Sequence, residues 1–513
     1  MKRGRVILVG AGPGAPDLVT VRGAEALRGA DAVVYDALAP EALLALAPPD
    51  ALRIDVGKRG HDAPTLPQDD TSALLVRLAA EGRTVVRLKG GDPYVFGRGG
   101  EEASACARAG IPFEVVPGVS SLFGALAYAG IPITDRRHSA SFAVATGHKD
   151  PSKVARETRW DLLARAADTL VVLMGARNLE EIAARLLHSG RSPATPAAVV
   201  MDGTLPSQRV VEAPLGELAG RAREAGVRAP AVIVVGDVAA LRGELAWFEQ
   251  QPLFGRRVLV TRSEDRAADL VGALLSAGAE PCVLPMIRML PAEDTNRLDA
   301  ALARVAASDG YDFVVWTSAS AVRFASERAR ALQIDLSRTR AIGVCVGPTT
   351  AETARAAGLP AQVVPDRSDA QGVLELLRRL SPRGRRFLLP RSSLAREELP
   401  EGLRREGAEV DAVIAYRTVP AEVDAAALRA ALRADEFAAL TFTSPSAARH
   451  FTALLDPPSL EASRRCAVAA IGSVTAAALA QAGLPADAVA GEPSARALVA
   501  ALAESVAGAR EGR

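Results

Sequence analysis

The sequence is poor in the residues that build disulfides and metal centres. Among its 513 residues are four cysteines, Cys106, Cys282, Cys345 and Cys466, which stand far apart and form no CxxC pair. We therefore expect reduced, mostly buried thiols in a cytosolic protein. The five histidines lack the spacing of metal ligands, so no structural metal is expected.

Long apolar runs and an excess of charge of one sign are also missing. No apolar run reaches the roughly 18 residues of a membrane span. The basic start MKRGRVILVGAGPG turns into a glycine loop after a short apolar run, which does not fit a signal peptide. Lys plus Arg number 61 and Asp plus Glu number 60, a balance that argues against general binding to nucleic acid or membrane surfaces.

The chain has ample material for several folded cores. Its length exceeds that of one domain, and three or four domains are expected at roughly 100–200 residues each. Hydrophobic residues make up 49% of the sequence. Strand patterns alternate with helix patterns throughout, which is typical of α/β domains.

A glycine-rich stretch, VRLKGGDPYVFGRGGEE over residues 86–102, organises the first half. An apolar strand ends at a paired glycine, and an acid, an aromatic and more glycines follow before a helix opens near Glu101. Five glycines between Gly90 and Gly100 are costly to order unless a ligand or close packing requires them. We interpret the stretch as a ligand loop; the alternative is a mobile surface loop.

The first strand also runs into glycines, at Gly10 and Gly12. With Ala15 these satisfy a dinucleotide-binding pattern. Pro13 and Pro16 count against it, because a diphosphate needs free N–H groups at a helix that starts at once, and the helix pattern begins only near Thr20. We therefore expect a loop that bends around a ligand without a diphosphate.

Further polar residues lie where predicted strands end. Asp36 and Lys58 follow two such strands, and strand ends border the binding crevice of an open α/β sheet. A turn acid and a solvated lysine are the alternatives. Ser120 and Ser121 suit either a ligand or a helix cap. Met174 suits either core filling or contact with a flat ligand.

Eight motifs occur in the order found in tetrapyrrole methylases. They are GAGPGAPDLVT, VVYD, VGKRG, RLKGGDPYVFGRGGEE, PGVSS, AYAGIPIT, VLMG and QRVV. The chain resembles the uroporphyrinogen III C-methyltransferases most, over about residues 4–245. This resemblance implies two α/β domains with S-adenosylmethionine (SAM) in the cleft between them, and a homodimer formed through the methylase half.

The resemblance also implies site residues. The SAM contacts carried over are Pro13, Gly90, Gly91, Asp92, Val95, Ser120, Ser121, Met174 and Gly203. Asp36 becomes the proton acceptor and Lys58 the proton donor, and Arg87 is placed near the substrate. The substrate carries eight carboxylates, so basic residues at the cleft rim are expected ligands, namely Lys58, Arg59, Arg87, Arg98, Arg136 and Arg137. Ordinary solvation is the alternative for each. Asp135 departs from the family, which more often has His there.

The second half repeats itself at an offset of roughly 125–130 residues, which predicts two similar parallel α/β halves. Arg262 matches Arg391, Ser318 matches Ser444, and Gly347 matches Gly472. Hydroxyls and N–H groups at helix starts hold anions well, so a cleft for a polycarboxylate is predicted. Simple helix capping is the alternative.

Residues 255–513 resemble the uroporphyrinogen III synthase family through YRT around Tyr416, TSxSAV and VGPTTA. The family closes hydroxymethylbilane into a ring and inverts the last pyrrole without a cofactor. By resemblance Tyr416 helps the hydroxyl leave, although a core tyrosine is the alternative. The resemblance implies domains of about 255–289 plus 417–513 and of about 290–416, joined by a two-strand connector.

Together these features predict a bifunctional, cytoplasmic enzyme of tetrapyrrole synthesis. Residues 1–245 (subdomains about 1–138 and 139–245) would methylate uroporphyrinogen III twice with SAM to precorrin-2, and 246–254 would be a linker. The C-terminal half would make uroporphyrinogen III from hydroxymethylbilane. The alternatives are a methylase for a later precorrin, an inactive tetrapyrrole-binding C-terminal module and, last, a dinucleotide-dependent oxidoreductase.

Overall fold

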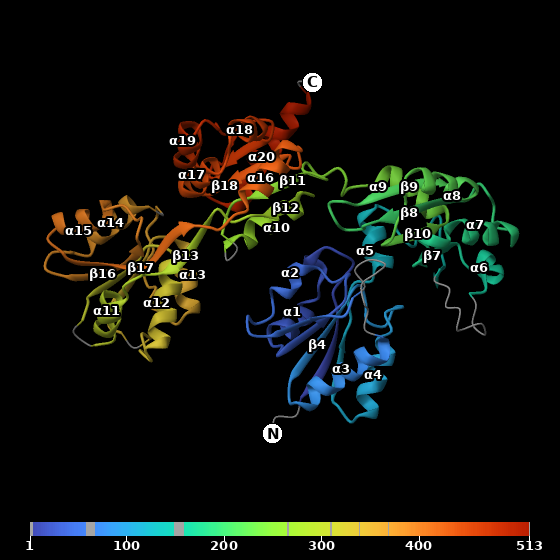
Figure 1. Ribbon diagram of the computed structural model, residues 1–513, viewed down its shortest axis with the longest axis horizontal. Coiled ribbons are helices and arrows are strands. Elements are labelled where there is room, and N and C mark those ends of the chain that lie inside the picture. Colours follow the sequence, from blue (N-terminus) through green and yellow to red (C-terminus); the bar gives the residue numbers. More distant parts are fainter. Residues whose placement is uncertain are drawn as a thin grey trace. The chain divides into compact units, whose positions relative to one another are not determined.

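The alternating patterns become four five-stranded sheets in the computed structural model, which describes residues 4–57, 67–147, 158–263, 266–307, 310–337, 339–367 and 369–511 (Figure 1). The chain divides into two compact units. One holds the residues up to Val258 with Gly272–Pro281 and the residues from Ala503, and the other holds Leu259–Val271 and Cys282–Leu502.

The first sheet is wholly parallel, with the strand order β3-β2-β4-β1-β5. Alternate residues of its strands enter two cores. Ile7 and Val86 pack beneath α1 and α2, while Val6 and Val85 pack beneath α3 and α4. The strands are β1 (Arg5–Gly10), β2 (Ala32–Tyr35), β3 (Leu52–Asp55), β4 (Thr84–Lys89) and β5 (Phe113–Val116), and the helices are α1 (Val21–Arg28), α2 (Glu41–Leu44), α3 (Gln68–Ala80) and α4 (Gly99–Arg108).

The second sheet is mixed, with the order β6-β7-β10-β8-β9. Strands β6 and β7 pair in parallel, whereas β10 lies between β7 and β8 and pairs antiparallel with both, and β8 and β9 are antiparallel as well. One face packs against α5 through Leu122 and Leu126, and the other packs against α6, α7 and α8. The elements are β6 (Phe142–Thr146), β7 (Thr169–Leu173), β8 (Pro196–Met201), β9 (Arg209–Pro214), β10 (Ala231–Val235), α5 (Ser121–Tyr128), α6 (Trp160–Ala166), α7 (Leu179–His188), α8 (Leu215–Glu224) and α9 (Arg242–Leu245).

The predicted linker after α9 packs on the first unit through aromatic rings. The ring centroids of Trp247 and Phe248 lie 5.0 and 4.8 Å from that of Tyr128. The indole N–H of Trp247 donates to the carbonyl of Ala127 at 3.0 Å, so this segment is ordered against α5.

The third sheet has the order β12-β11-β18-β19-β20, and its strands come from two stretches of sequence far apart. Its core contains Leu259, Phe442 and Phe451. The elements are β11 (Arg257–Val260), β12 (Glu280–Val283), β18 (Ala439–Phe442), β19 (Ala467–Ala470), β20 (Ala488–Val489), α10 (Ala268–Ser276), α16 (Ala425–Arg433), α17 (Pro445–Ala453), α18 (Pro457–Ser463), α19 (Ser473–Gln481) and α20 (Ala495–Glu511).

The fourth sheet has the order β13-β17-β16-β14-β15. Its neighbours pair in parallel except β13 and β17, which run antiparallel. The prediction of a purely parallel sheet is therefore wrong at this edge. The elements are β13 (Ile287–Pro291), β14 (Phe313–Trp316), β15 (Ile342–Cys345), β16 (Arg386–Ser392), β17 (Glu409–Pro420), α11 (Asn296–Ala306), α12 (Ala319–Ala331), α13 (Pro348–Ala356), α14 (Ala370–Arg379) and α15 (Glu398–Arg405).

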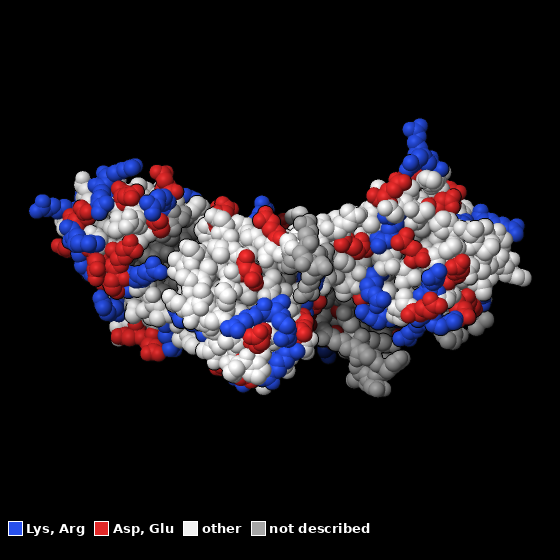
Figure 2. Space-filling model, turned by 90° about the horizontal axis from the view of Figure 1, so that it is seen from above, with Lys and Arg blue, Asp and Glu red and all other residues white. Residues whose placement is uncertain are grey.

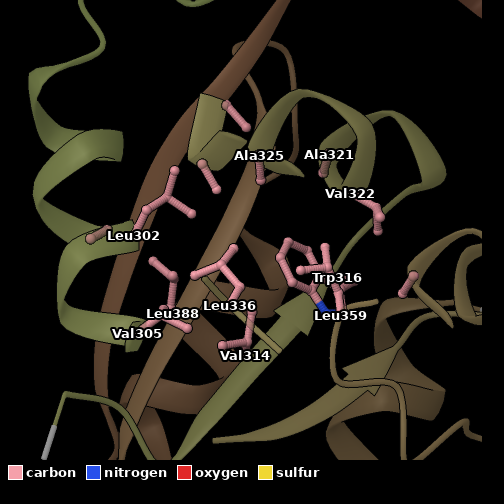
Figure 3. Packing of buried hydrophobic residues seen from close by; sticks show 14 of the residues in the cluster. Leu302, Val305, Val314, Trp316, Ala321, Val322, Ala325, Leu336, Leu359 and Leu388 are labelled. Atoms are coloured by element: carbon pink, nitrogen blue, oxygen red, sulfur yellow. The ribbon is translucent and has the colours of Figure 1, made fainter. Parts of the chain in front are cut away.

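Figure 3 shows one core of this fourth sheet. Leu302 and Val305 of α11 point toward Val314 and Leu388 of the strands, and Trp316 lies beside Leu359. Trp316 is fully buried, and its indole N–H donates to the carbonyl of Pro360 at 2.9 Å, which satisfies its single polar group.

Basic and acidic side chains are interspersed over the face seen in Figure 2, as the nearly balanced composition suggests. Among the residues described, no helix is long and apolar enough to cross a membrane. In the same residues no group of three or more His, Cys, Asp or Glu side chains is placed to hold a metal ion. Cys106, Cys345 and Cys466 are buried thiols, and Cys282 is half-buried.

Candidate active site

The parallel first sheet brings three loops to one edge. Strands β2, β4 and β1 are neighbours, so Tyr35, Lys89 and Gly10 end side by side. Asp36 follows the first of these strands and Gly90 follows the second. Such carboxyl ends are where ligands bind in open α/β sheets.

A cavity of about 980 Å³ opens at this edge and is also lined by loops of the second sheet. It has a mixed lining of apolar side chains, exposed backbone and a few charged groups, which suits a ligand of moderate size. Seven predicted site residues line it, although they come from loops up to 190 residues apart in the chain: Pro13, Asp36, Gly90, Val95, Ser121, Met174 and Gly203.

Three other predicted cofactor residues, Gly91, Asp92 and Ser120, are absent from the described residues that line the cavity. The backbones of Gly91 and Gly12 exchange hydrogen bonds of 2.7 and 3.3 Å, and Gly91 has a φ of +67° that favours glycine. The carboxylate of Asp92 accepts from the N–H groups of Tyr94 and Gly118, at 2.8 and 3.0 Å. Ser120 is the buried N-cap residue of α5. The contacts of Gly91 and Asp92 hold the neighbouring loops in place. That the three residues touch a cofactor directly stays a prediction.

Asp36 lines the cavity and is held by backbone N–H groups. Its Oδ1 accepts from the N–H groups of Leu38 and Gly90 at 3.2 and 3.3 Å, and its side chain remains 26% exposed. The contact to Leu38 is that of a turn acid, which is the alternative that the sequence offers for Asp36. The contact to Gly90 in addition fastens the carboxylate to the glycine loop.

Arg87 lies behind Asp36. Its side chain is only 6% exposed, and it is absent from the described residues that line the cavity. Its Nε donates to Glu102 at 3.0 Å, while Nη2 lies 3.7 Å from Asp36. The structure therefore places Arg87 next to the predicted proton acceptor, and its place near the substrate stays a prediction.

Sequence reasoning missed Lys89 and Glu102. Lys89 lines the cavity, yet its side chain is 4% exposed and its Nζ lies 3.1 Å from both carboxylate oxygens of Glu102. Burial, and then the nearby Arg87 guanidinium, lower the pKa of Lys89. The signal was present in the sequence: Arg87 and Lys89 share one face of a buried strand, and buried cations need a carboxylate partner.

The other basic residues predicted as substrate ligands at the cleft rim have different outcomes. Arg98 lines the cavity and pairs with Glu101, whereas Arg136 and Arg137 are absent from the described lining residues. Lys58 and Arg59 lie outside the described residues. The roles predicted for them, proton donor and rim ligand, stay predictions.

Strained backbone concentrates at this cavity. Phe96, Arg98, Met174 and Asp202 all line it, and their φ values are +52°, +59°, +56° and +48°. Positive φ is uncommon outside glycine and persists where the surrounding structure enforces it. The concentration supports a binding role for the cavity.

Thr204 ties the two sheets of this unit together. The N–H of Ala15, in the loop after β1, donates to the Thr204 hydroxyl at 2.9 Å in buried surroundings. We expect Thr204→Val, which keeps the shape and removes the acceptor, to lower the free energy of unfolding by about 1–3 kcal/mol. Denaturant titration of the first unit's transition measures it. Thr204→Ser keeps the hydroxyl and serves as the control; equal losses for both would contradict the role of this bond.

In the second unit Tyr416 is buried within the core of the fourth sheet. Its ring stacks on Phe324 with a centroid distance of 5.4 Å, and its hydroxyl lies 3.2 Å from the Ser318 hydroxyl. Ser318 in turn caps α12 by accepting from the N–H of Ala321. Tyr416 is therefore a core residue, as the alternative predicted. Its hydroxyl also lies beside Ser318, the residue at which α12 starts.

The repeated hydroxyls and glycines cap helices in both copies. Ser318 and Ser444 accept from N–H groups three residues on, at 3.1 and 3.2 Å. Gly347 and Gly472 are the N-cap residues of α13 and α19. The two copies therefore place equivalent residues at equivalent helix starts, as the repeat predicts.

Comparison with known proteins fits this division. A family model described as "Tetrapyrrole (Corrin/Porphyrin) Methylases" matches residues 5–219, and one described as "Uroporphyrinogen-III synthase HemD" matches residues 268–500. A relative, "Porphyrin biosynthesis protein HemD" of Ruminiclostridium josui, is 35% identical over 469 residues, 90% of this chain and 91% of the relative. The chain belongs to this family, a tetrapyrrole methylase joined to a uroporphyrinogen-III synthase.

The methylase half has further relatives. "Siroheme synthase" of Neisseria meningitidis serogroup A is 52% identical over 245 residues, 48% of this chain and 49% of the relative, so the chain spans about half the length of the siroheme synthases it matches. The solved uroporphyrin-III C-methyltransferase of Thermus thermophilus is 44% identical and covers 48% of this chain and 97% of its own, with a TM-score of 0.40. The enzyme solved with S-adenyl homocysteine is 42% identical and covers 46% of this chain and 100% of its own, with a TM-score of 0.41.

Proposed function

We propose that this protein is a bifunctional enzyme of tetrapyrrole synthesis. Its synthase half cyclises hydroxymethylbilane to uroporphyrinogen III with inversion of the D ring. Its methylase half then transfers methyl groups from SAM to C2 and C7 and gives precorrin-2. The observation that carries the methylase proposal is the cavity that gathers Pro13, Asp36, Gly90, Met174 and Gly203 from separate loops.

SAM is the methyl donor in this proposal. Methyl transfer from a sulfonium needs an in-line nucleophile held close to the methyl group, and it needs no metal. The exposed backbone at Gly90 and the half-exposed Met174 offer polar and apolar contacts to such a donor. The named contact residues of the cofactor remain those carried over from the family.

Asp36 is the proposed proton acceptor. The attacking pyrrole ring must lose a proton after methylation, and a positioned carboxylate can take it. Asp36 is the part-exposed carboxylate beside the glycine loop, and its hydrogen bonds to Leu38 and Gly90 hold it there. Lys58 is the proposed proton donor.

Tyr416 is the proposed helper of hydroxyl departure in the synthase half. A neutral phenol can donate a hydrogen bond to the leaving oxygen. We expect Tyr416→Phe to slow uroporphyrinogen III formation about tenfold through loss of that bond. The assay is ring closure of hydroxymethylbilane, with isomers separated by chromatography. Tyr311→Phe, which loses a hydroxyl bound to Asp411, is the control and should keep the rate; equal losses would contradict the role of Tyr416.

The domain limits and assembly complete the proposal. We infer a methylase of residues 1–245 (subdomains about 1–138 and 139–245), a linker of 246–254 and a synthase of 255–513 with domains of about 255–289 plus 417–513 and about 290–416. The methylase half would form a homodimer, and the enzyme would act in the cytoplasm.

One assay of the full chain tests the whole proposal. Hydroxymethylbilane is supplied with and without SAM, and products are identified by mass and isomer. We expect uroporphyrinogen III without SAM and its doubly methylated product with SAM. The type I isomer alone would favour an inactive C-terminal binding module. Uroporphyrinogen III that stays unmethylated in the presence of SAM would favour the rival substrate, a later precorrin.

A further inference from the structure

We propose that Glu102 is a positioning residue of the methylase site: it anchors Arg87 and Lys89 and thereby keeps the carboxylate of Asp36 available to the substrate. The inference rests on the proposed methyl transfer and deepens it. Neither Glu102 nor Lys89 belongs to the residues carried over from the family.

Glu102 is an unusual residue for its surroundings. It lies in the first turn of α4 and is completely buried. Its Oε1 accepts from Arg87 at 3.0 Å, from Lys89 at 3.1 Å and from the Gln68 amide at 3.2 Å. Burying a carboxylate costs free energy unless it is paired and hydrogen-bonded. Arg87 and Lys89 of β4 pair with Glu102, but its buried Oε2 lies 3.1 Å from Lys89 Nζ without accepting a hydrogen bond from the described residues.

The contacts of Glu102 determine where Arg87 points. Arg87 Nε is bound to Glu102, and Nη1 donates to the carbonyls of Val34 and Leu88 at 3.4 and 2.9 Å. Only Nη2 faces Asp36, at 3.7 Å, which is longer than a hydrogen bond. The guanidinium of Arg87 is thus close enough to attract the carboxylate of Asp36 but forms no hydrogen bond with it.

With all four groups ionised, the two negative and two positive charges of this cluster balance. The carboxylates of Asp36 and Glu102 face the cations of Arg87 and Lys89. If Glu102 were neutral, Asp36 would be the one carboxylate left for two buried cations. Arg87 would then be free to turn and bind Asp36 directly, which would withdraw the carboxylate from the cavity and make it a weaker base.

The surroundings of the cluster contribute few other charges among the described residues. Beside its own four members, Cys106 of α4 lies near the cluster, and burial and then Glu102 raise the pKa of that thiol. Arg98, Arg177 and Asp202 line the same cavity. The cations paired with Glu102 and Asp36, Arg87 and Lys89, both lie on β4. A change in the charge of one member should be felt strongly by the others.

The test measures kcat against pH for methylation of uroporphyrinogen III by the full chain. In Glu102→Gln the cluster loses one negative charge, and the more positive surroundings favour the ionised form of Asp36. We expect the acid limb of the profile to move to lower pH by about one unit, with a plateau about tenfold lower. Glu102→Asp keeps the charge and should leave the limb in place.

A substitution at Lys89 should shift the acid limb in the opposite direction. Lys89→Met removes a positive charge, so the acid limb should move to higher pH. The double variant Glu102→Gln with Lys89→Met restores the net charge and should return the limb toward its original position. Glu81→Gln, at an exposed pair with Arg83 on the same unit, is the control and should change nothing.

The outcomes separate this inference from the proposed function. Calorimetry with S-adenosylhomocysteine reports whether each variant keeps the cofactor pocket, and an inactive wild-type protein would overturn the methylase proposal itself. If the wild type is active and Glu102→Gln loses rate at every pH with an unmoved limb, Glu102 is merely structural and the inference is wrong. Opposite shifts in the two single variants, cancelled in the double variant, would establish it.

Discussion

Replacing Asp36 by asparagine will slow methyl transfer about a thousandfold and leave S-adenosylhomocysteine binding nearly unchanged. The rate and the binding affinity should respond differently, because asparagine has nearly the same size and shape as aspartate but cannot act as a base. Asparagine keeps the oxygen that accepts from the N–H groups of Leu38 and Gly90. The loop should therefore stay in place, while the group that takes the proton is lost.

The measurement is single-turnover methylation of uroporphyrinogen III beside calorimetry with S-adenosylhomocysteine. Asp55→Asn is a matched control, because Asp55 ends the neighbouring strand β3 and accepts from the N–H of Gly57 at 2.8 Å, but does not line the cavity. We expect the control to lose less than about twofold. If Asp36→Asn kept more than about a tenth of the rate, Asp36 would not be the proton acceptor.

Substituting alanine for Gly10 will damage both stability and the site. A Cβ at Gly10 would lie 2.4 Å from the Cα of Gly118 and 2.7 Å from the carbonyl oxygen of Gly91. Both obstacles are backbone atoms, so no side chain can rotate away to relieve the clash. The ends of β1 and β5 and the glycine loop would have to move apart.

We expect a loss of about 3 kcal/mol or more in the free energy of unfolding of the first unit, together with at least tenfold weaker binding of S-adenosylhomocysteine. Denaturant titration and calorimetry measure the two effects. Gly100→Ala is the control: it lies in α4, its Cβ would meet nothing within 4 Å, and alanine favours a helix. Similar stability for both variants would show that the close approach of Gly10 to Gly118 and Gly91 tolerates a side chain.

Local signals in the sequence were sufficient for much of this fold. Thr20 was predicted to start a helix, and it caps α1 by accepting from the N–H of Gly23. The repeat predicted equivalent residues at Ser318 and Ser444, and both cap helices. Capping and strand alternation depend on neighbours a few residues away, which the sequence states directly.

Other features depend on residues that meet only after folding. The antiparallel return of β10 between β7 and β8 has no signature in its own apolar run. The same holds for β13, which pairs antiparallel with the long strand β17. A strand's apolar run predicts that it is buried but does not specify the direction of its neighbour.

The sequence alone determined the two-part family assignment and the loops that form the cavity, because ordered motifs and glycine-rich strand ends are local and specific. Tertiary structure decided what those residues face. It placed Arg87 behind Asp36, brought Glu102 onto Arg87 and Lys89, and joined Ala15 to Thr204. The physical reason is that buried charges and polar groups must find partners in three dimensions, and those partners are set by packing across elements far apart in the chain.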